Sequence, residues 1–257
     1  SCIEGGPVGS RVVYYEETDS TNTRAKALAE EGAEEGTLVV AERQNAGKGR
    51  RGRGWSSPPG SGIWMSMVLR PDIEPSHASM VTLVAALGVS EGIFQVTGIM
   101  PQIKWPNDLV LSGKKICGIL TEMTTELDAV QYVVVGMGTN VNTTGFPEEL
   151  EKKASSLYLE SGKLWKRGPL IGAMARALGE YYEIFMDAKD LSPVKETYEK
   201  RLANLNRQVT VLAPKGSYGG ICRGIDSQGE LLVELEDGTV SRVISGEVSV
   251  RGIYGYG

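Results

Sequence analysis

Apolar and polar positions follow two different periods along the first 200 residues. Short runs rich in β-branched and aromatic residues, bounded by turn residues, are typical of strands. Five such runs predict strands, at 12–15, 38–41, 63–69, 116–123 and 130–137. Helical spacing of apolar residues predicts four helices, from 20 to Gly32 or Gly36 and at 76–96, 169–187 and 192–203. Gly88 and Gly92 weaken the prediction for the later part of the helix at 76–96.

The last 50 residues have a different pattern. Five short runs typical of strands follow Asn206, separated by turn residues such as Asp226-Ser227-Gln228-Gly229. They lie at 209–212, 220–225, 231–235, 240–244 and 248–253. Short strands at this spacing predict a small β-barrel. We therefore expect two domains, at 1–205 and 206–257, with a boundary near Leu205.

Composition narrows the class of protein. Hydrophobic residues make up 41% of the 257 residues and charged residues 23%, which is ordinary for a globular chain with a substantial core. The 27 Lys and Arg against 32 Asp and Glu argue against a general nucleic-acid binder. We expect no membrane span, since no apolar run approaches about 18–20 residues, and no signal peptide at the N-terminus. Three widely spaced cysteines fit a cytoplasmic protein with reduced thiols.

A basic, glycine-rich segment follows the strand expected at 38–41. It reads Gly47-Lys48-Gly49-Arg50-Arg51-Gly52-Arg53-Gly54-Trp55. Four such cations do not fit a packed core, and the glycines allow the backbone to turn tightly around an anion. The segment therefore predicts a loop that binds phosphate or another anion. A solvated basic run and a nucleic-acid patch remain open for this segment alone, whereas a P-loop is excluded because Gly49 replaces the required Ser or Thr.

A second unusual string runs from Lys104 to Leu109 as Lys-Trp-Pro-Asn-Asp-Leu. Pro106 cannot donate to a sheet ladder, so we expect Trp105 to be extended at a strand end. Lys104 would then lie at the mouth of a sheet, where a cation can meet an anionic ligand. Asn107 and Asp108 could cap the next turn or offer oxygens to Mg²⁺. A simple turn with a surface lysine is the alternative that this string leaves open.

In their order and spacing, these segments resemble those of the biotin–protein ligases, also called biotin–acetyl-CoA-carboxylase ligases. The resemblance runs from about Tyr14 to Arg251. It is carried by Asp19-Ser20-Thr21-Asn22, Gln44 with Gly47–Trp55, Lys104–Leu109, Lys115 with Gly118-Ile119-Leu120, Gly136–Asn142 and Ser245-Gly246-Glu247-Val248-Ser249.

The resemblance implies an α+β fold. Its mixed-sheet catalytic domain would resemble the class II synthetase and biotin ligase fold, followed by the small C-terminal β-barrel. It also implies a two-step reaction with biotin and Mg-ATP as substrates. Biotin first attacks the α-phosphate of ATP to give biotinyl-5′-AMP, and a lysine of a biotin carboxyl carrier protein then takes the biotinyl group. Because the carboxylate is itself the nucleophile, this chemistry needs no histidine base.

The resemblance also assigns roles to individual residues. For biotin these are Ser20, Thr21, Asn22, Gln44, Gly47, Lys48, Gly49, Arg50, Lys104, Gly118 and Ile119. For ATP or the adenylate they are Arg50, Arg51, Gly52, Arg53, Trp55, Asn107, Lys115 and Asn140. Lys104 is the expected main catalytic cation, supported by Arg50 and Lys115, and Asp108 is a candidate metal ligand. By residue type alone, Trp55 and Trp105 favour packing over stacking.

Two features depart from the family pattern. Lys48 stands where arginine is frequent, which keeps the charge but loses the bidentate fork. An aromatic residue that covers the adenine in some members has no assigned counterpart here, since Phe146 does not fit that role, so the cover of the adenine stays open.

Partners and rival functions complete the expectations. With about 11 residues before the first strand, we expect no helix-turn-helix domain and no repressor function or nucleic-acid partner. A homodimer could form if 132–135 were an edge strand. The rivals are a lipoate ligase or octanoyltransferase, whose substrate end should be apolar, and a nucleic-acid-binding module that uses the basic run Lys48–Arg53.

Overall fold

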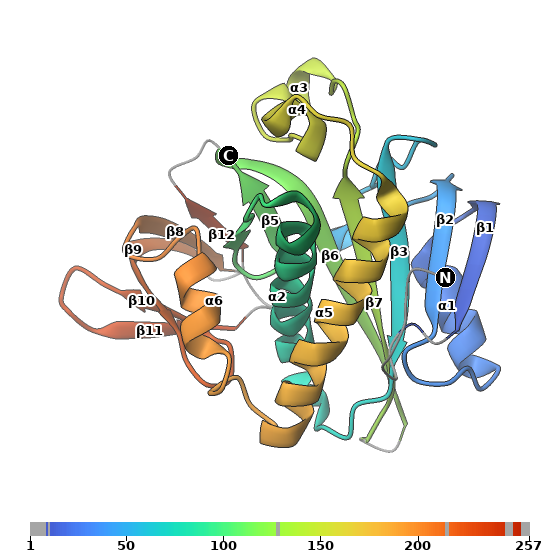
Figure 1. The fold of residues 1–257 in the computed structure, drawn as a ribbon. Helices are drawn as coiled ribbons and strands as arrows, with labels where there is room; N and C mark the ends of the chain where they lie inside the picture. The colour runs from blue at the N-terminus through green and yellow to red at the C-terminus, as the bar shows by residue number, and fades with distance from the viewer. Residues whose placement is uncertain (1–8, 10, 127–128, 214–215, 245–248, 253–257) are drawn as a thin grey trace.

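The computed structural model of the chain describes residues 9, 11–126, 129–213, 216–244 and 249–252. The turn centre expected at 127–128 and the Ser245–Val248 part of the barrel motif lie outside the described residues. Strands and helices are mixed along the chain up to residue 201, and the described elements that follow are all strands (Figure 1).

The first part of the chain is built on a mixed seven-stranded sheet. Its strands are β1 (Val12–Thr18), β2 (Leu38–Gln44), β3 (Gly62–Leu69), β4 (Gln102–Lys104), β5 (Asp108–Leu111), β6 (Lys114–Glu126) and β7 (Ala129–Asn140). They are ordered β1-β2-β3-β7-β6-β5-β4, with β1 and β2 parallel and every other pair antiparallel. The expected α+β fold with a mixed sheet is confirmed.

This order corrects the proposed dimer edge. Residues 132–135 belong to β7, which lies between β3 and β6 in the middle of the sheet, and their side chains are buried. A strand paired on both sides has no free ladder to offer a second copy. The suggestion that 132–135 form an edge strand is therefore wrong.

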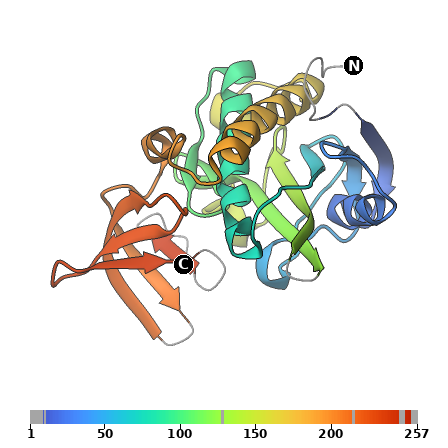
Figure 2. The same cartoon turned by 90° about the horizontal axis from the view of Figure 1, so that it is seen from below.

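Helices cover both faces of the sheet. The helical elements are α1 (Thr21–Glu30), η1 (Arg50–Gly52), η2 (Pro75–His77), α2 (Ala78–Thr97), α3 (Glu148–Glu151), α4 (Leu157–Ser161), α5 (Arg167–Ala188) and α6 (Lys195–Arg201). The long helices α2 and α5 lie side by side over one face (Figures 1 and 2). Helix α1 packs against the other face, where Ala25 and Ala29 join Val39, Val68 and Val134 in a small separate apolar cluster.

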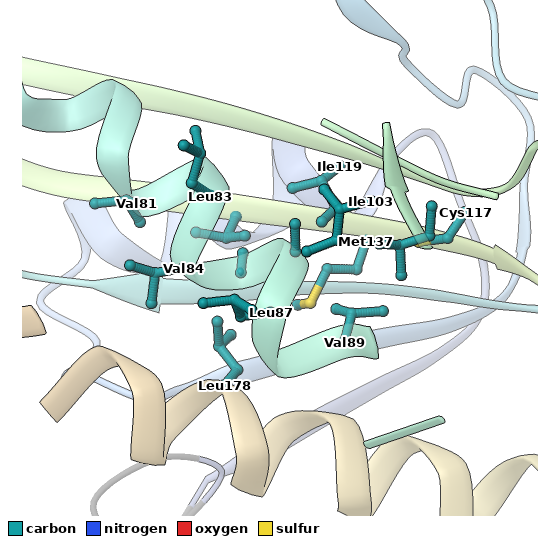
Figure 3. Close-up of a cluster of buried hydrophobic side chains, with 14 of the residues drawn as sticks. Val81, Leu83, Val84, Leu87, Val89, Ile103, Cys117, Ile119, Met137 and Leu178 are labelled. Carbon is teal, nitrogen blue, oxygen red and sulfur yellow. The ribbon is translucent and has the colours of Figure 1, made fainter. Parts of the chain in front are cut away.

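Strand periodicity explains how one sheet serves two faces, because successive side chains point to opposite sides. On β7, Val133, Val135 and Met137 belong to the main core beneath α2, whereas Val134 belongs to the cluster beneath α1. At Gly136, two residues further, the position that a Cβ would occupy therefore faces the α1 side. Figure 3 shows the apolar side, where Met137, Ile119, Ile103 and Cys117 lie along α2 in one buried cluster with Leu83 and Leu87.

Gly88 and Gly92, which weakened the helix prediction, lie within an unbroken α2. A Cβ at Gly88 would collide with the backbone of Leu178, and one at Gly92 with the backbone of Met174. The two glycines therefore let α2 and α5 approach backbone to backbone. Tertiary packing outweighs the low helix propensity of glycine here.

Helix α2 also changes one expectation. The segment Pro75–Thr97 has 23 residues, and its most apolar window has a mean hydropathy of 1.5, enough by length and composition alone to cross a membrane. The expectation that no stretch of the chain approaches that length was therefore wrong. The same window is 72% buried inside the protein. Helix α2 packs against the sheet on one side and against α5 on the other. Its apolar composition is therefore that of a core helix.

The last strands form a separate, small antiparallel sheet (Figure 2). Its members are β8 (Gln208–Ala213), β9 (Gly216–Ile225), β10 (Leu231–Glu234), β11 (Val240–Val243) and β12 (Ser249–Gly252), ordered β11-β10-β9-β8-β12. Buried Trp105 donates from Nε1 to the Gly229 carbonyl (3.1 Å) and so ties this sheet to the first part. Buried residues of both sheets, including Val209 and Leu231, belong to one continuous core.

Two groups of short elements were missed by the sequence, and one predicted helix is shorter than expected. The short strands β4 and β5 have too few residues for a period to show. The one-turn helices α3 and α4 were also unpredicted, and α6 is shorter than the segment 192–203 suggested.

Candidate functional site

A cavity lies on the α1 face of the large sheet, enclosed by β3, β6, β7, the start of α1 and the basic loop. Twelve predicted residues line it: Ser20, Thr21, Asn22, Gln44, Lys48, Gly49, Arg50, Trp55, Asn107, Lys115, Gly118 and Ile119. Its other lining residues are Trp64, Met65, Leu120, Gly136, Met137 and Gly138. Segments more than 100 residues apart in sequence thus converge on one pocket.

The floor of the cavity is bare backbone. Gly118 of β6 pairs with Gly138 of β7, and Gly136 faces Leu120 across the same two strands. A Cβ at Gly138 would lie 2.6 Å from Trp55 Nε1, and one at Gly136 would collide with the Asn22 side-chain amide. These three glycines therefore create the space of the site, since any side chain there would fill it.

A network of neutral polar groups forms one wall. Gln44 Oε1 accepts from the Thr21 backbone N–H (2.8 Å) and hydroxyl (3.0 Å), and Gln44 Nε2 donates to the Ser57 hydroxyl (2.7 Å). Ser66 Oγ lies within donating distance of Thr21 Oγ1 (2.7 Å) and of Asn22 Oδ1 (2.6 Å). The polar groups of this wall can form hydrogen bonds with a ligand that has N–H and C=O groups. An apolar ligand tail would offer these wall groups no partner.

The start of α1 supplies part of this wall. Ser20 is the N-cap residue, but its side chain does not cap the helix. Asp19 Oδ1 instead accepts from the Ser20 backbone N–H (2.8 Å) and is held by the Thr18 hydroxyl (2.9 Å). The cap cluster predicted at 19–22 is thus confirmed as a helix start, with Ser20, Thr21 and Asn22 facing the cavity.

The basic loop forms a small hairpin over the cavity. Trp55 N–H donates to the Gly47 carbonyl (2.8 Å), and Gly49 N–H donates to the Arg53 carbonyl (2.7 Å). Arg51 has a φ of 59°, a left-handed conformation that turns the tip, and Lys48 Nζ donates to Thr23 Oγ1 (3.1 Å) on α1. This geometry turns Lys48 and Arg50 to the cavity.

Other predicted loop residues do not line the cavity. Gly47 lies at the hairpin base, where a Cβ would meet the Ser57 hydroxyl at 2.9 Å. Arg51, Gly52 and Arg53 are exposed at the tip. Their proposed contacts with the nucleotide stay predictions.

Trp55 fills much of the pocket. Its indole lies against the backbone of Gly118 and Gly138, and Lys115 Nζ lies 5.0 Å from the ring centroid, a cation–π arrangement. The buried Trp55 Nε1 has no hydrogen-bond partner in the structure. The free space that remains is about 40 Å³, whereas one water needs roughly 10–15 Å³. A ligand larger than a few water molecules must therefore displace the Trp55 side chain to enter this space.

Lys115 presents its charge inside the site. Its Nζ forms an ion pair with Asp108 Oδ1 at 2.6 Å, and 22% of its side chain is exposed. Main-chain bonds hold it on both sides: its N–H donates to the Lys153 carbonyl (2.8 Å), and its carbonyl accepts from Ser155 N–H (2.9 Å). The segment 153–155 therefore fixes Lys115 beside the cavity.

Lys104 lies on the same face but not at the cavity. A row of paired residues crosses the sheet from Trp64 through Gly138, Gly118 and Asp108 to Lys104. Neighbouring strands are about 4.8 Å apart, so the Lys104 backbone lies roughly 10 Å from that of Gly118. Among the residues that the structure describes, Lys104 is not one that lines the cavity, whereas Lys115 is. Its assigned role stays a prediction.

The two predicted asparagines differ in position. Asn107 lines the cavity, with Nδ2 donating to the Ile119 carbonyl (3.1 Å). Asn140 is buried and donates from Nδ2 to the Ser155 carbonyl (3.1 Å), so it supports the segment beside Lys115. Its predicted contact with the adenylate stays a prediction.

Burial and neighbouring charges shift the pKa values of two side chains, those of Arg50 and Cys117. Burial lowers the pKa of the Arg50 guanidinium, and the nearby charge of Arg51 lowers it further. An anion bound between these arginines would relieve both effects. On the opposite face, burial raises the pKa of the Cys117 thiol to about 12, so this cysteine is an inert core residue.

Trp64 and Met65 are the lining residues that the sequence did not suggest. Both lie on β3, whose apolar pattern was that of an ordinary buried strand. The indole of Trp64 donates to the Pro58 carbonyl (3.3 Å) and walls the pocket beside Gly138. No residue-type signal separates such a wall residue from core.

Fold and site together define a protein ligase of the class that couples vitamin-like acids to proteins. The sequence model of the biotin/lipoate A/B protein ligase family matches residues 14–140, and that of the biotin protein ligase C-terminal domain matches 205–251. The bifunctional ligase/repressor BirA of Bacillus subtilis is 38% identical over 95% of this chain and 75% of its own length. The biotin–acetyl-CoA-carboxylase ligase of Paracoccus denitrificans is 33% identical over 84% and 91%.

Comparison with solved structures supports the same family. The biotin protein ligase of Aquifex aeolicus, in complex with biotin and ATP, matches with a TM-score of 0.82 and 32% identity, over 95% of this chain and 99% of that one. The chain therefore belongs to the biotin protein ligase family.

Proposed function

We propose that this chain activates biotin with ATP and transfers it to a lysine of a biotin carboxyl carrier protein or domain. One observation carries the proposal: a pocket whose neutral polar wall and cationic loop meet over a glycine floor. The family to which the chain belongs, and the biotin and ATP complex of the Aquifex aeolicus relative, support it.

In the first step, a carboxylate oxygen of biotin attacks the α-phosphorus of ATP. A P–O bond forms, the bond to the pyrophosphate leaving group breaks, and biotinyl-5′-AMP results. Both reactants are anionic, so cations must offset their repulsion and stabilise the charge that develops at phosphorus. Holding the two reactants in line supplies much of the remaining acceleration.

Three of the described cations line the cavity, Lys48, Arg50 and Lys115. Lys48 is exposed and its Nζ donates to Thr23 on α1, so Lys115 and Arg50 are better placed for this role. Lys115 is additionally held in place by Asp108 and by the segment 153–155. We therefore propose the main electrostatic role for Lys115 and a supporting role for Lys104 on the same face, which reverses the order that the resemblance implied.

In the second step, the amine of the acceptor lysine attacks the carbonyl carbon of biotinyl-5′-AMP. An amide bond forms, the acyl–phosphate bond breaks, AMP leaves with the electron pair, and the attacking nitrogen releases one proton to solvent. The hairpin Gly47–Trp55 must open for substrates because Trp55 fills the pocket, and we propose that it then closes over the adenylate.

Mg²⁺ fits this site only as part of the substrate Mg-ATP. Within the described part of the chain, no group of three His, Cys, Asp or Glu side chains could hold a metal ion. The carboxylate of Asp108, the candidate metal ligand, already pairs with Lys115. The donors present therefore suit a cation that arrives on phosphate oxygens and takes one carboxylate at most.

The remaining expectations are part of the same proposal. The polar wall of Thr21, Asn22 and Gln44 suits the ureido ring of biotin and disfavours lipoate or octanoate, which offer it no N–H groups. We also propose that the protein is cytoplasmic and acts without nucleic acid, and a homodimer, if formed, must use a surface other than 132–135.

The test is incubation of the protein with biotin, Mg-ATP and a biotin carboxyl carrier domain, followed by mass spectrometry of the carrier. We expect one biotinyl group on one lysine of the carrier. The carrier should stay unmodified when ATP is omitted, and it should carry no lipoyl group when lipoate replaces biotin. Stabilisation by lipoate but not biotin in a thermal-shift measurement, with no biotinylated carrier, would reject the proposal.

A further inference from the structure

Glu122 lies on β6 outside the cavity and contacts one of its lining residues. Its Oε2 accepts from Asn22 Nδ2 at 2.8 Å, and its Oε1 accepts from Lys26 Nζ at 2.6 Å. Both partners belong to α1, so Glu122 joins the sheet to the first turns of that helix. About a quarter of its side chain is exposed (26%). No motif in the sequence pointed to this carboxylate.

The contacts of Asn22 determine which end of its amide faces the site. Nδ2 lies near two groups that can only accept, the Glu122 carboxylate and the Leu120 carbonyl (3.3 Å). The amide nitrogen must therefore point to β6. The carbonyl oxygen Oδ1 is left facing the Ser66 hydroxyl and the bare backbone of Gly136, on the cavity floor.

An amide oxygen has two acceptor positions, and Ser66 occupies one of them. The other is available to a ligand in the cavity. If the amide turned by 180°, its NH₂ group would face the hydroxyl of Ser66, and the oxygen would face a carboxylate. The site would then present a donor where it now presents an acceptor.

From this geometry we propose that Glu122, paired with Lys26, is a positioning residue that fixes the Asn22 amide so that the site recognises an N–H donor of its ligand. The inference rests on the proposed function and names the ureido N–H of biotin as that donor. Glu122 sets specificity through Asn22, and Lys26 holds Glu122 in place.

The charges around Glu122 keep it in the form that this role needs. Burial works to raise its pKa, but the hydrogen bonds from Lys26 and Asn22, with further help from the charge of Lys48, hold the pKa below its usual value. At neutral pH the carboxylate is therefore ionised and can only accept. A protonated carboxyl could donate and would allow the flipped amide.

Three variants test the inference by their affinity for biotin, measured by calorimetry and as KM in a pyrophosphate-release assay. Glu122→Met should raise the Kd and KM for biotin about tenfold, with kcat and the KM for ATP within about twofold. Glu122→Gln keeps one acceptor oxygen and should restore biotin binding to within about threefold of the original. Lys26→Met should have an intermediate effect, about threefold, because Lys26 acts one contact further away.

Glu126→Met is the matched control, since Glu126 is an exposed glutamate at the end of the same strand, and its carboxylate accepts from Gln131 on β7. Its biotin KM should not change. If it rises as much as that of Glu122→Met, the effect belongs to the strand and not to the Asn22 contact, and the inference is wrong.

A double-mutant cycle separates positioning from general destabilisation. In an Asn22→Ala background, Glu122→Met should leave biotin affinity unchanged within about twofold, because the residue it positions is gone. A further tenfold loss in that background would overturn the inference. So would an unchanged biotin Kd for Glu122→Met alone, or an equal rise in the KM for ATP.

Failure of this inference can be told apart from failure of the proposed function. An unmodified protein that forms no biotinyl-5′-AMP contradicts the proposed function itself. An active protein whose Glu122→Met and Lys26→Met variants bind biotin normally contradicts only the positioning role. If Glu122→Met fails to fold, as judged by its thermal transition, Lys26→Met and Glu122→Gln decide the question, and an unchanged biotin Kd for Lys26→Met overturns it.

Discussion

The two faces of the large sheet use the same strands for opposite purposes. Beneath α2, successive inward positions of β7 carry Val133, Val135 and Met137, and all are buried in the main core. On the α1 side, the intervening positions beyond Val134 carry Gly136 and Gly138, and their missing side chains make the cavity. Stability and binding are thus separated by the two-residue period of a strand.

The same contrast holds on β3 and β6. On β3, Met65 and Met67 pack into the core, while Ser66, on the site face between them, joins the polar wall. On β6, Ile119 packs against α2, while Gly118 lies under Trp55. A residue one position along the chain therefore decides between a fold effect and a ligand effect. Met65, Ile119 and Met137 belong to the core and also line the cavity, so the contrast is sharpest at core residues such as Leu87 that do not line it.

The largest expected effect is on the site face, at Lys115. Lys115→Met should lower the rate of biotinyl-5′-AMP formation roughly 1000-fold, or ~4 kcal/mol, since it removes a positioned cation from the reacting phosphate. Lys114→Met is the matched control and should keep the rate within about twofold. Single-turnover adenylation measures both. Near-normal adenylation by Lys115→Met would remove it from the assigned role.

On the core face, Leu87→Ala should mainly affect stability. Leu87 is fully buried in α2, so we expect a loss of about 2–5 kcal/mol in the free energy of unfolding. Denaturant titration measures it. The biotin KM of the folded fraction should be unchanged, and a large rise in KM at full folding would show that the two faces are not separated.

Gly138→Val tests the floor of the site. We expect adenylation to fall about 100-fold, because the new side chain occupies space that the ligand needs, while the thermal transition shifts by less than about 3 °C. Valine suits a strand, and the clash is with Trp55 on the movable loop rather than with the core. A strong loss of stability would place Gly138 in the packing of the fold.

The smallest effect is expected at Lys104. It shares the site face and the cross-strand row with Asp108, but it does not line the cavity in the described structure. Lys104→Met should therefore slow adenylation by about tenfold or less, well below the effect of Lys115→Met. The comparison of the two variants in one assay is decisive. A larger loss for Lys104 would return the main electrostatic role to it.

Much of this contrast could be predicted from the sequence. Clear strand and helix periods gave the main elements, and clustered charge with glycine pointed to the anion-binding loop. Most of the other lining residues were predicted only from the resemblance to the biotin–protein ligases. The residue types of the cluster Asp19–Asn22 predicted a helix start, and the resemblance added its role as a ligand wall; hydroxyls and amides suit both roles.

The rest depends on tertiary arrangement. Lys104 and Lys115 are equally basic in sequence, and only the register of β4, β5 and β6 separates the one at the cavity from the one beyond Asp108. Gly88 and Gly92 weakened the helix prediction because the close packing of α5 against them cannot be read from the sequence. Glu122 and Trp64 could not be recognised at all, because their roles come from what faces them across the sheet.

The most direct test is the crystal structure of the protein with biotinyl-5′-AMP. We expect the ureido ring beside Thr21 and Asn22, the phosphate beside Lys115 and Arg50, and the Trp55 indole displaced from Gly118 and Gly138. The adenylate bound elsewhere, with Trp55 still resting on the two glycines, would contradict the account.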